Sequence, residues 1–345
     1  MFVSASTIDD LLLSVFKKTL SSKTFTVNQR GNTTEVTGAL LKLTRPRFRL
    51  SQTETKRTLF SGFGELLWYL AGTTNLKFIS YYVPQYPKFS DGRGGYGPRL
   101  FKMRGAINQV DNIIRLLKTE DRLESRQAVI QLFDAYDLVQ KKTKDIPCTC
   151  TLQFLVRRHR QHHRLHMFVS MRSNDAYKGL PHDLFSFTML QEIVARSLGV
   201  ELGTYNHAVG SLHIYDDDRP DVEQYLREGY QSTKSETSAM PPMPMGDPWS
   251  SISRLRNIEI KIRNGKSVDL NNLQLDPYWL DIVRLLLIHS VLRKKKLSKS
   301  DKTKLRNLKR AMHSQYYITH VLKRQRKKSA GALPRQLTLE KIIKV

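Results

Sequence analysis

Residues 171–183 read MRSNDAYKGLPHD, and they connect an apolar strand-like segment, 165–171, to an apolar helix-like segment, 184–197. Cations, hydroxyls, carboxylates, glycine and proline all occur within this stretch. A purely structural connection would not need so many hydrogen-bonding groups. We therefore interpret the stretch as the floor of a polar pocket, in which Arg172 can hold a phosphate and also polarise a nearby thiolate.

The segments upstream of this stretch predict a β-hairpin. Residues 150–156 alternate as a strand, and 165–171 have the pattern of its hairpin partner. The turn between them, RRHRQHHR (157–164), contains three histidines that could be read as a metal site. We favour a solvated hairpin tip, because no acid or cysteine lies nearby in the sequence, and we predict no metal site.

The remaining periodicity indicates a mixed α/β (α+β) fold with flanking helices. Helical spacing occurs at 7–19, 63–70, 110–118 and 184–197, and strand-like patterns occur at 34–50, 128–133 and 258–262. Residues 81–98 are rich in Tyr, Pro and Gly, which is typical of a covering loop. Asp276-Pro277 supplies a cap and first-turn proline for a further helix. We expect a catalytic domain at 1–230, a linker with a completing strand and helix at 231–292, and a basic helical extension at 293–345.

The charge of the chain points to anionic partners. The net charge is +26, and residues 293–328 contain fifteen Lys or Arg against the single acid Asp301. Such a region can contact nucleic acid or an acidic protein, or it can be a solvated helical appendage packed on the dimer. Aromatic residues of the single-strand-binding type are not interleaved with the charges, which weakens the case for nucleic acid. No apolar run is long enough to span a membrane, and the N-terminus lacks a basic signal region. Two cysteines one residue apart form no disulfide framework, so we expect a reducing, cytoplasmic setting.

One of these cysteines is the candidate nucleophile. Cys148 follows Pro147 at the start of the predicted strand 150–156. A lone cysteine in a strand is usually an inert core residue, and only a thiolate in a cationic or hydrogen-bonding environment is nucleophilic. The neighbouring polar stretch, 171–183, favours a nucleophilic role for Cys148 over a structural one. Further along, His213-Ile214-Tyr215 predicts two hydrogen-bonding rings on one face of a strand.

Several separate motifs together resemble the thymidylate synthase family. They agree in order and spacing over about residues 30–215, and they are ELLWYLAGTTN (65–75), YGP (96–98), SR (125–126), PC (147–148), RSNDAYKGLPHD (172–183) and HIY (213–215). The resemblance implies a mixed α/β domain whose sheets stack back to back in an obligate homodimer. It also implies a pyrimidine nucleoside monophosphate as substrate and 5,10-methylenetetrahydrofolate as the one-carbon donor.

The resemblance also implies roles for individual residues. Cys148 would attack C6 of the pyrimidine, Glu65 would organise water and relay protons, and Asp175 would assist folate and proton handling. The phosphate and sugar would be held by Arg30, Arg172, Ser173, His213 and Tyr215, joined by Arg126 from the partner subunit. Arg30, in NQRGN, is the loosest of these matches.

Departures from the family pattern favour a cytosine nucleotide and a hydroxymethyl product. Asp183 takes the place of the asparagine that matches the uracil edge in thymidylate synthases, and in this the chain resembles the family's deoxycytidylate and cytidylate hydroxymethylases. The alternative is that Asp183 only forms a salt bridge with Lys178 or another basic neighbour. Gln127 replaces the second arginine of the usual pair. Leu100 stands where we expect the tyrosine that helps remove the C5 proton, with Tyr96 nearby. A missing tryptophan pair and closing C-terminal segment would leave the site more open to water.

Two other functions remain open from the sequence. One is an ordinary thymidylate synthase that methylates dUMP to dTMP. The other, of a different class, is a catalytically retired scaffold that binds nucleic acid through its basic tail. Retention of Cys148, Glu65, Arg172, Asp175 and His213 together argues against retirement.

Overall fold

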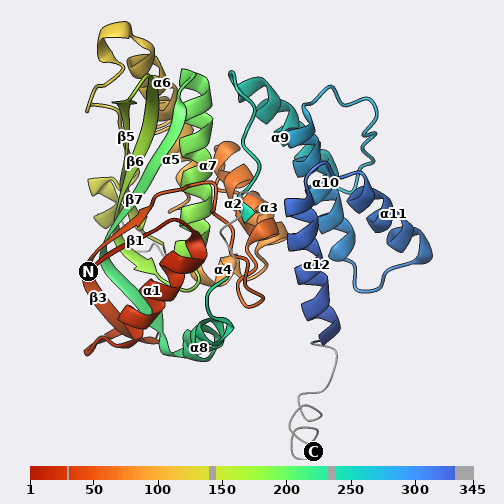
Figure 1. Ribbon diagram of the computed structural model, residues 1–345, viewed down its shortest axis with the longest axis horizontal. Helices are drawn as coiled ribbons and strands as arrows, with labels where there is room; N and C mark the ends of the chain where they lie inside the picture. The colour runs from red at the N-terminus through yellow and green to blue at the C-terminus, as the bar shows by residue number, and fades with distance from the viewer. Residues whose placement is uncertain (29–30, 140–144, 232–237, 331–345) are drawn as a thin grey trace, which may run out of the picture.

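One side of the molecule is formed by a seven-stranded mixed sheet (Figure 1). Its strands follow the order β1-β3-β7-β6-β5-β4, and β2 pairs with β3 beside this path. The β1–β3 and β6–β7 pairs are parallel and the others are antiparallel. The structure is a computed structural model that describes residues 1–28, 31–139, 145–231 and 238–330. The strands are β1 Phe2–Ala5, β2 Thr24–Asn28, β3 Gly31–Leu43, β4 Val129–Gln131, β5 Thr149–His159, β6 His162–Asp175 and β7 Glu201–Tyr215.

Helices α1 and α7 pack on one face of this sheet, and the group α9–α12 lies farther from the strands on the same side, where α10 contacts α2 (Figure 1). The helices are α1 Ile8–Leu20, α2 Leu59–Leu70, α3 Leu76–Tyr82, α4 Tyr86–Phe89, α5 Tyr96–Phe101, α6 Gln109–Lys118, α7 Leu180–Leu198, α8 Arg219–Glu228, α9 Trp249–Arg263, α10 Pro277–Leu292, α11 Lys299–Arg310 and α12 Gln315–Ala330. Short 3-10 turns cover Glu120–Arg122, Ala135–Leu138 and Asp216–Asp218. The expected mixed α/β architecture is therefore confirmed.

The predicted hairpin is present as β5 and β6. Strict alternation buries Leu152, Phe154 and Val156 of β5 beneath α7, while Leu155 of β5 and Phe168 of β6 lie on the opposite face and are only half-buried. The turn falls at 160–161, where Arg160 takes a positive φ of 56°. Half-buried apolar side chains on the outer face leave this side of the sheet suited to a further packing partner.

Three expectations about secondary structure were wrong. The segment 258–262 is helical, within α9, because Ile252, Leu255, Ile258 and Ile262 recur at helical spacing and are all buried. The short alternation IEIKI is strand-like only when it is taken out of that longer pattern. Strand β3 ends at Leu43 rather than 50, ahead of proline, which cannot donate to a strand ladder. Segment 81–98 includes α4, the end of α3 and the start of α5.

The basic C-terminal region contains the helices α11 and α12 in its described part, as predicted, and it is docked on the rest of the molecule. The Tyr317 ring of α12 lies 6.3 Å from the Phe63 ring of α2, centroid to centroid. On the same helix, Lys323 donates to the backbone oxygen of Gln52. Buried apolar side chains of α11 and α12 belong to the same continuous core as the sheet. Residues 331–345 lie outside the described part of the chain.

A fully buried ion pair connects α7 to the loop that precedes α2. Arg49 Nη2 lies 2.6 Å from Glu192 Oε2, and neither side chain is exposed. Glu192 also accepts a hydrogen bond of 2.9 Å from the backbone of Met243. Glu192→Gln should therefore lower the free energy of unfolding by roughly 3–5 kcal/mol, because it leaves the Arg49 charge buried and unpaired.

Urea unfolding of the unmodified protein and of Glu192→Gln measures this loss of unfolding free energy. Glu201→Gln is the matched control, because it breaks the exposed pair with Arg164, whose N···O distance is 3.0 Å; that change should cost no more than about 1 kcal/mol. Equal effects of the two substitutions would contradict the argument from burial.

Candidate active site

Cys148 lies at the head of β5, directly beside Arg172 on β6. The backbone nitrogen of Arg172 donates to the carbonyl oxygen of Cys148 over 2.8 Å. The guanidinium donates to the carbonyl oxygens of Pro147 (3.0 Å) and Ile146 (2.8 Å), so it holds the segment that leads into the cysteine. Cys148 is half-buried and Arg172 is exposed. The sulfur is therefore not sealed in an apolar interior away from this arginine.

The ends of β6 and β7 bring four further candidates onto one face. These strands are parallel, and Ser173 is paired with Ser211 while Asp175 is paired with His213. Tyr215 follows two residues later on the same face, with its ring 5.1 Å from the His213 ring and nearly perpendicular to it. Ser173, Asp175, His213 and Tyr215 thus share one surface at the end of the sheet.

The turn after β6 fixes the carboxylate of Asp175 and leads into α7. Asp175 Oδ1 accepts hydrogen bonds from the backbone nitrogens of Tyr177 (2.8 Å) and Lys178 (2.9 Å). A Cβ atom at Gly179 would lie only 2.7 Å from Asn174 Oδ1, so this position requires glycine. Lys178 forms its salt bridge with Asp218, at 2.7 Å, and not with Asp183.

Asp183 lies in the first turn of α7 with only 8% of its surface exposed. Burial raises its pKa well above the usual value, and the charge of Glu65 raises it further, while a hydrogen bond from Asn174 acts in the opposite direction. Glu65 is half-buried on α2 and accepts a hydrogen bond of 2.7 Å from the Tyr69 hydroxyl. The surroundings of Asp183 therefore favour its protonated form, and Glu65 is the nearby carboxyl group whose charge contributes to this shift.

The structure also brings in Tyr96, whose place sequence reasoning left open. Its hydroxyl accepts a hydrogen bond from the backbone nitrogen of Thr149 (3.2 Å) and lies 2.9 Å from the Thr149 hydroxyl, one residue from Cys148. Burial, then the charges of Asp183 and Cys148, raise its pKa well above the usual value. Leu100 is only 1% exposed and belongs to the hydrophobic core. The YGP motif was the available signal for Tyr96.

Lys56 is a second residue that the sequence did not single out. Its ammonium nitrogen lies 3.6 Å from the centre of the Tyr177 ring. Burial lowers its pKa to about 8, although the nearby charge of Asp175 acts in the opposite direction. The only signal in the sequence was a Lys-Arg pair just before an apolar helix, a pattern that is usually solvated.

Arg126 is predicted to reach the phosphate site of the partner subunit rather than that of its own chain. Arg126 is exposed just before β4, at the edge of the sheet, and its carbonyl oxygen accepts a hydrogen bond from Gln153. Arg30 lies outside the described residues. Within a single chain, the described phosphate-binding candidates beside Cys148 are Arg172 and Ser173.

Within the described ranges, no three His, Cys, Asp or Glu side chains are grouped to hold a metal ion. At the hairpin tip, His163 instead lies 3.5 Å from Glu124. None of the helices in the described ranges is both long enough and apolar enough to cross a membrane.

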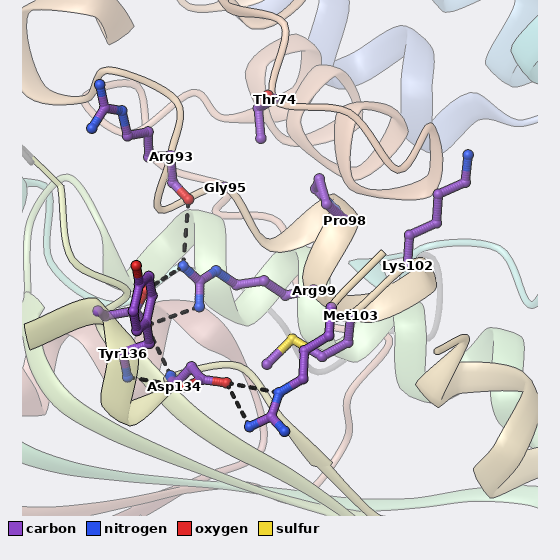
Figure 2. A pocket seen from close by; sticks show the side chains of 11 residues that line it. Thr74, Arg93, Gly95, Pro98, Arg99, Lys102, Met103, Asp134 and Tyr136 are labelled. Carbon is purple, nitrogen blue, oxygen red and sulfur yellow. Dashed lines mark hydrogen bonds and ion pairs between the residues drawn. The ribbon is translucent and has the colours of Figure 1, made fainter. Parts of the chain in front are cut away.

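A separate cavity of about 550 Å³ lies beside α5 (Figure 2). Arg99 reaches across it to both carboxylate oxygens of Asp137 (2.9 and 2.6 Å), and Arg104 pairs with Asp134 at 3.0 Å. None of the predicted catalytic or nucleotide-binding residues lines this cavity. Its central charges are already paired, so we do not assign the chemistry to it.

The fold and the arrangement around Cys148 define a class that comparison with known proteins identifies. The thymidylate synthase family model matches residues 10–266, and the chain belongs to this family. It is 31% identical over 176 residues to the thymidylate synthase of Buchnera aphidicola subsp. Baizongia pistaciae (strain Bp), covering 48% of this chain and 64% of the relative. It is 30% identical over 217 residues to the deoxyuridylate hydroxymethyltransferase of Delftia phage PhiW-14, covering 58% of each. The chain thus spans less than two thirds of either relative's length.

Proposed function

We propose that this protein transfers a one-carbon unit to C5 of a pyrimidine nucleoside monophosphate, with dCMP or CMP as substrate and the hydroxymethyl nucleotide as product. The observation that carries the proposal is the half-buried Cys148 at the head of β5, beside Arg172 and one residue from the Tyr96 contact. Family membership supports the reaction class. The name of the phage relative supports a hydroxymethyl product but specifies deoxyuridylate, so uracil nucleotides remain the specific alternative.

The chemistry begins with addition of the Cys148 thiolate to C6 of the base. For cytosine, this addition moves negative charge through C5 toward N3. Asp183 is buried and its pKa is raised, which favours the protonated form. In that form it would give its proton to N3 and then accept hydrogen bonds from N3–H and the 4-amino group. Tyr96, a neutral phenol beside the cysteine strand, is placed to pass on the proton that leaves C5. Loss of Cys148 from C6 then restores the aromatic ring.

The residues present are compatible with a bound folate. Asp175 uses Oδ1 for its own turn, and among the described residues no hydrogen-bond donor is placed on Oδ2, which leaves an acceptor for a pterin N–H edge. Lys56 and Arg57 precede α2 and supply positive charge for a carboxylate-bearing tail. When bound, 5,10-methylenetetrahydrofolate supplies the methylene carbon, and water supplies the oxygen of the hydroxymethyl product.

Nucleotide binding in this proposal requires two subunits. Arg172 and Ser173 hold the phosphate, His213 and Tyr215 hold the sugar hydroxyl, and Arg126 reaches in from the partner subunit. The half-buried outer face of β5 and β6, with Leu155 and Phe168, is the surface on which a second copy would stack. We propose that Arg30 belongs to the same phosphate site.

Tritium release from 5-tritiated dCMP, CMP and dUMP, with and without methylenetetrahydrofolate, tests the proposal. We expect folate-dependent release from a cytosine nucleotide, without the absorbance change of dihydrofolate formation. Release from dUMP alone would exclude the cytosine assignment, and accompanying dihydrofolate would identify a thymidylate synthase. No release from any nucleotide would favour the retired scaffold.

Tyr96→Phe should lower kcat by roughly 10²- to 10⁴-fold with little change in KM, because it removes a proton-transfer group and leaves the binding surface intact. Tyr136→Phe is the control, since that tyrosine is 64% exposed and lines the separate cavity. Steady-state kinetics on the preferred nucleotide measure both. If Tyr96→Phe changes only KM, or lowers only the thermal stability, the contact between Tyr96 and Thr149 is structural.

A further inference from the structure

A dense group of unpaired cations surrounds α11, outside the residues matched by the family model. Seven exposed Lys and Arg side chains here form no ion pair with any described residue. We call this group the α11 basic surface: Lys295, Lys296, Lys299, Lys302, Lys304, Arg306 and Arg310. The only acid in the region is Asp301, which is 8% exposed and accepts a hydrogen bond of 2.6 Å from Lys294. No carboxylate is therefore available locally to neutralise the surface.

The helix presents these charges from a fixed position. Leu305 and Leu308 bury one side of α11 and join the main hydrophobic core, while Ser298 and Asp301 form a capping box at the start of the helix. Lys299, Lys302, Arg306 and Arg310 recur at spacings of three and four, which places them in one stripe along the helix. At 1.5 Å per residue the stripe is roughly 16 Å long.

We propose that the α11 basic surface binds the phosphate backbone of duplex nucleic acid without reading its sequence. A duplex carries one charge per roughly 1.7 Å of its axis, so a stripe of this length can face several phosphates. An acidic protein partner would normally bury aromatic or apolar anchors as well, and among the described residues between Arg293 and Arg310 no large hydrophobic side chain is exposed. Single strands would require stacking aromatics, which are also missing from this segment.

The location of the surface allows it to act independently of the proposed active site. In Figure 1, α11 lies at the far end of the helical group α9–α12, on the opposite side of the molecule from the strands that carry Cys148 and Arg172. Binding of a duplex at α11 therefore leaves the nucleotide site and the outer face of the sheet accessible.

Fluorescence anisotropy with the full-length chain and two unrelated duplex DNAs of about 20 base pairs tests the proposal. Affinity should be equal for both sequences and should fall roughly 10²- to 10⁴-fold between about 50 and 200 mM salt, as expected for four to seven phosphate contacts. Lys302→Gln/Arg306→Gln should weaken binding to both duplexes and reduce the slope of log K against log salt by about 2.

Lys118→Gln/Arg122→Gln is the matched control, because it removes the same charge at the same spacing from exposed positions at the end of α6 and just beyond it. It should bind duplex like the unmodified protein, and tritium release by both variants should be unchanged. Three results would each overturn the proposal. They are equal weakening of duplex binding by the control variant, tighter binding to single strands than to duplex, and displacement of the bound duplex by a polyglutamate peptide at a lower concentration than unlabelled duplex requires.

Discussion

Cys148→Ala is expected to lower tritium release from the preferred nucleotide by at least ~10⁴-fold, because the proposed mechanism relies on the Cys148 thiolate for the bond to C6 that activates C5. Cys148 is half-buried at the strand end, where Arg172 donates to its carbonyl oxygen. Nucleotide binding, measured by calorimetry, should survive the change, since the proposed phosphate and sugar ligands remain. Loss of activity with retained binding separates a nucleophile from a packing residue.

The second cysteine provides a control within the same strand. Cys150 is also half-buried, and it lies at the irregularity where the β5–β6 register shifts between Thr149 and Thr151. Cys150→Ala removes a thiol of the same size two residues away, so it should leave tritium release within a few-fold of the original rate. Inactivity of Cys150→Ala with activity retained in Cys148→Ala would reverse the assignment.

Local sequence patterns were sufficient for the parts of the fold that are regular and buried. The β5–β6 hairpin, α7 and α10 follow from alternation or helical spacing that burial then confirms. The strand prediction for segment 258–262 was wrong because its five alternating residues fit both the strand period and the helical period. Packing on α10 selects the longer helical pattern, in which the residues at spacings of three and four from Ile252 to Ile262 are buried. A short pattern carries too little information when tertiary contacts select the longer one.

The site residues likewise divide into those whose contacts are local in the sequence and those whose contacts join distant segments of the chain. Asp175 and its turn could be anticipated, because their hydrogen bonds lie within a few residues. Lys56 and the hydroxyl of Tyr96 could not, because their partners Tyr177 and Thr149 lie far along the chain. The roles of the site residues themselves remain predictions that the variants above address.

Asp183→Asn is expected to lower kcat on the cytosine nucleotide by roughly 10²- to 10⁴-fold while leaving or raising turnover of dUMP. Burial and the Glu65 charge raise the pKa of Asp183 and so favour the protonated form, which in our proposal gives a proton to N3 as Cys148 adds to C6. An amide cannot give up that proton. For uracil the charge develops on O4 instead, and an amide NH₂ group can donate a hydrogen bond there without transferring a proton.

The pH dependence provides a second, independent test of the same residue. The reactive acid form of Asp183 is present below its raised pKa and is lost above it, so kcat/KM for the cytosine nucleotide should fall on the alkaline side. In Asp183→Asn that alkaline limb should disappear from the residual activity, because the amide does not titrate. An unchanged preference for cytosine together with an unchanged pH profile in the variant would contradict a proton-donating Asp183, and the buried carboxyl group would then be explained by its hydrogen bond with Asn174 alone.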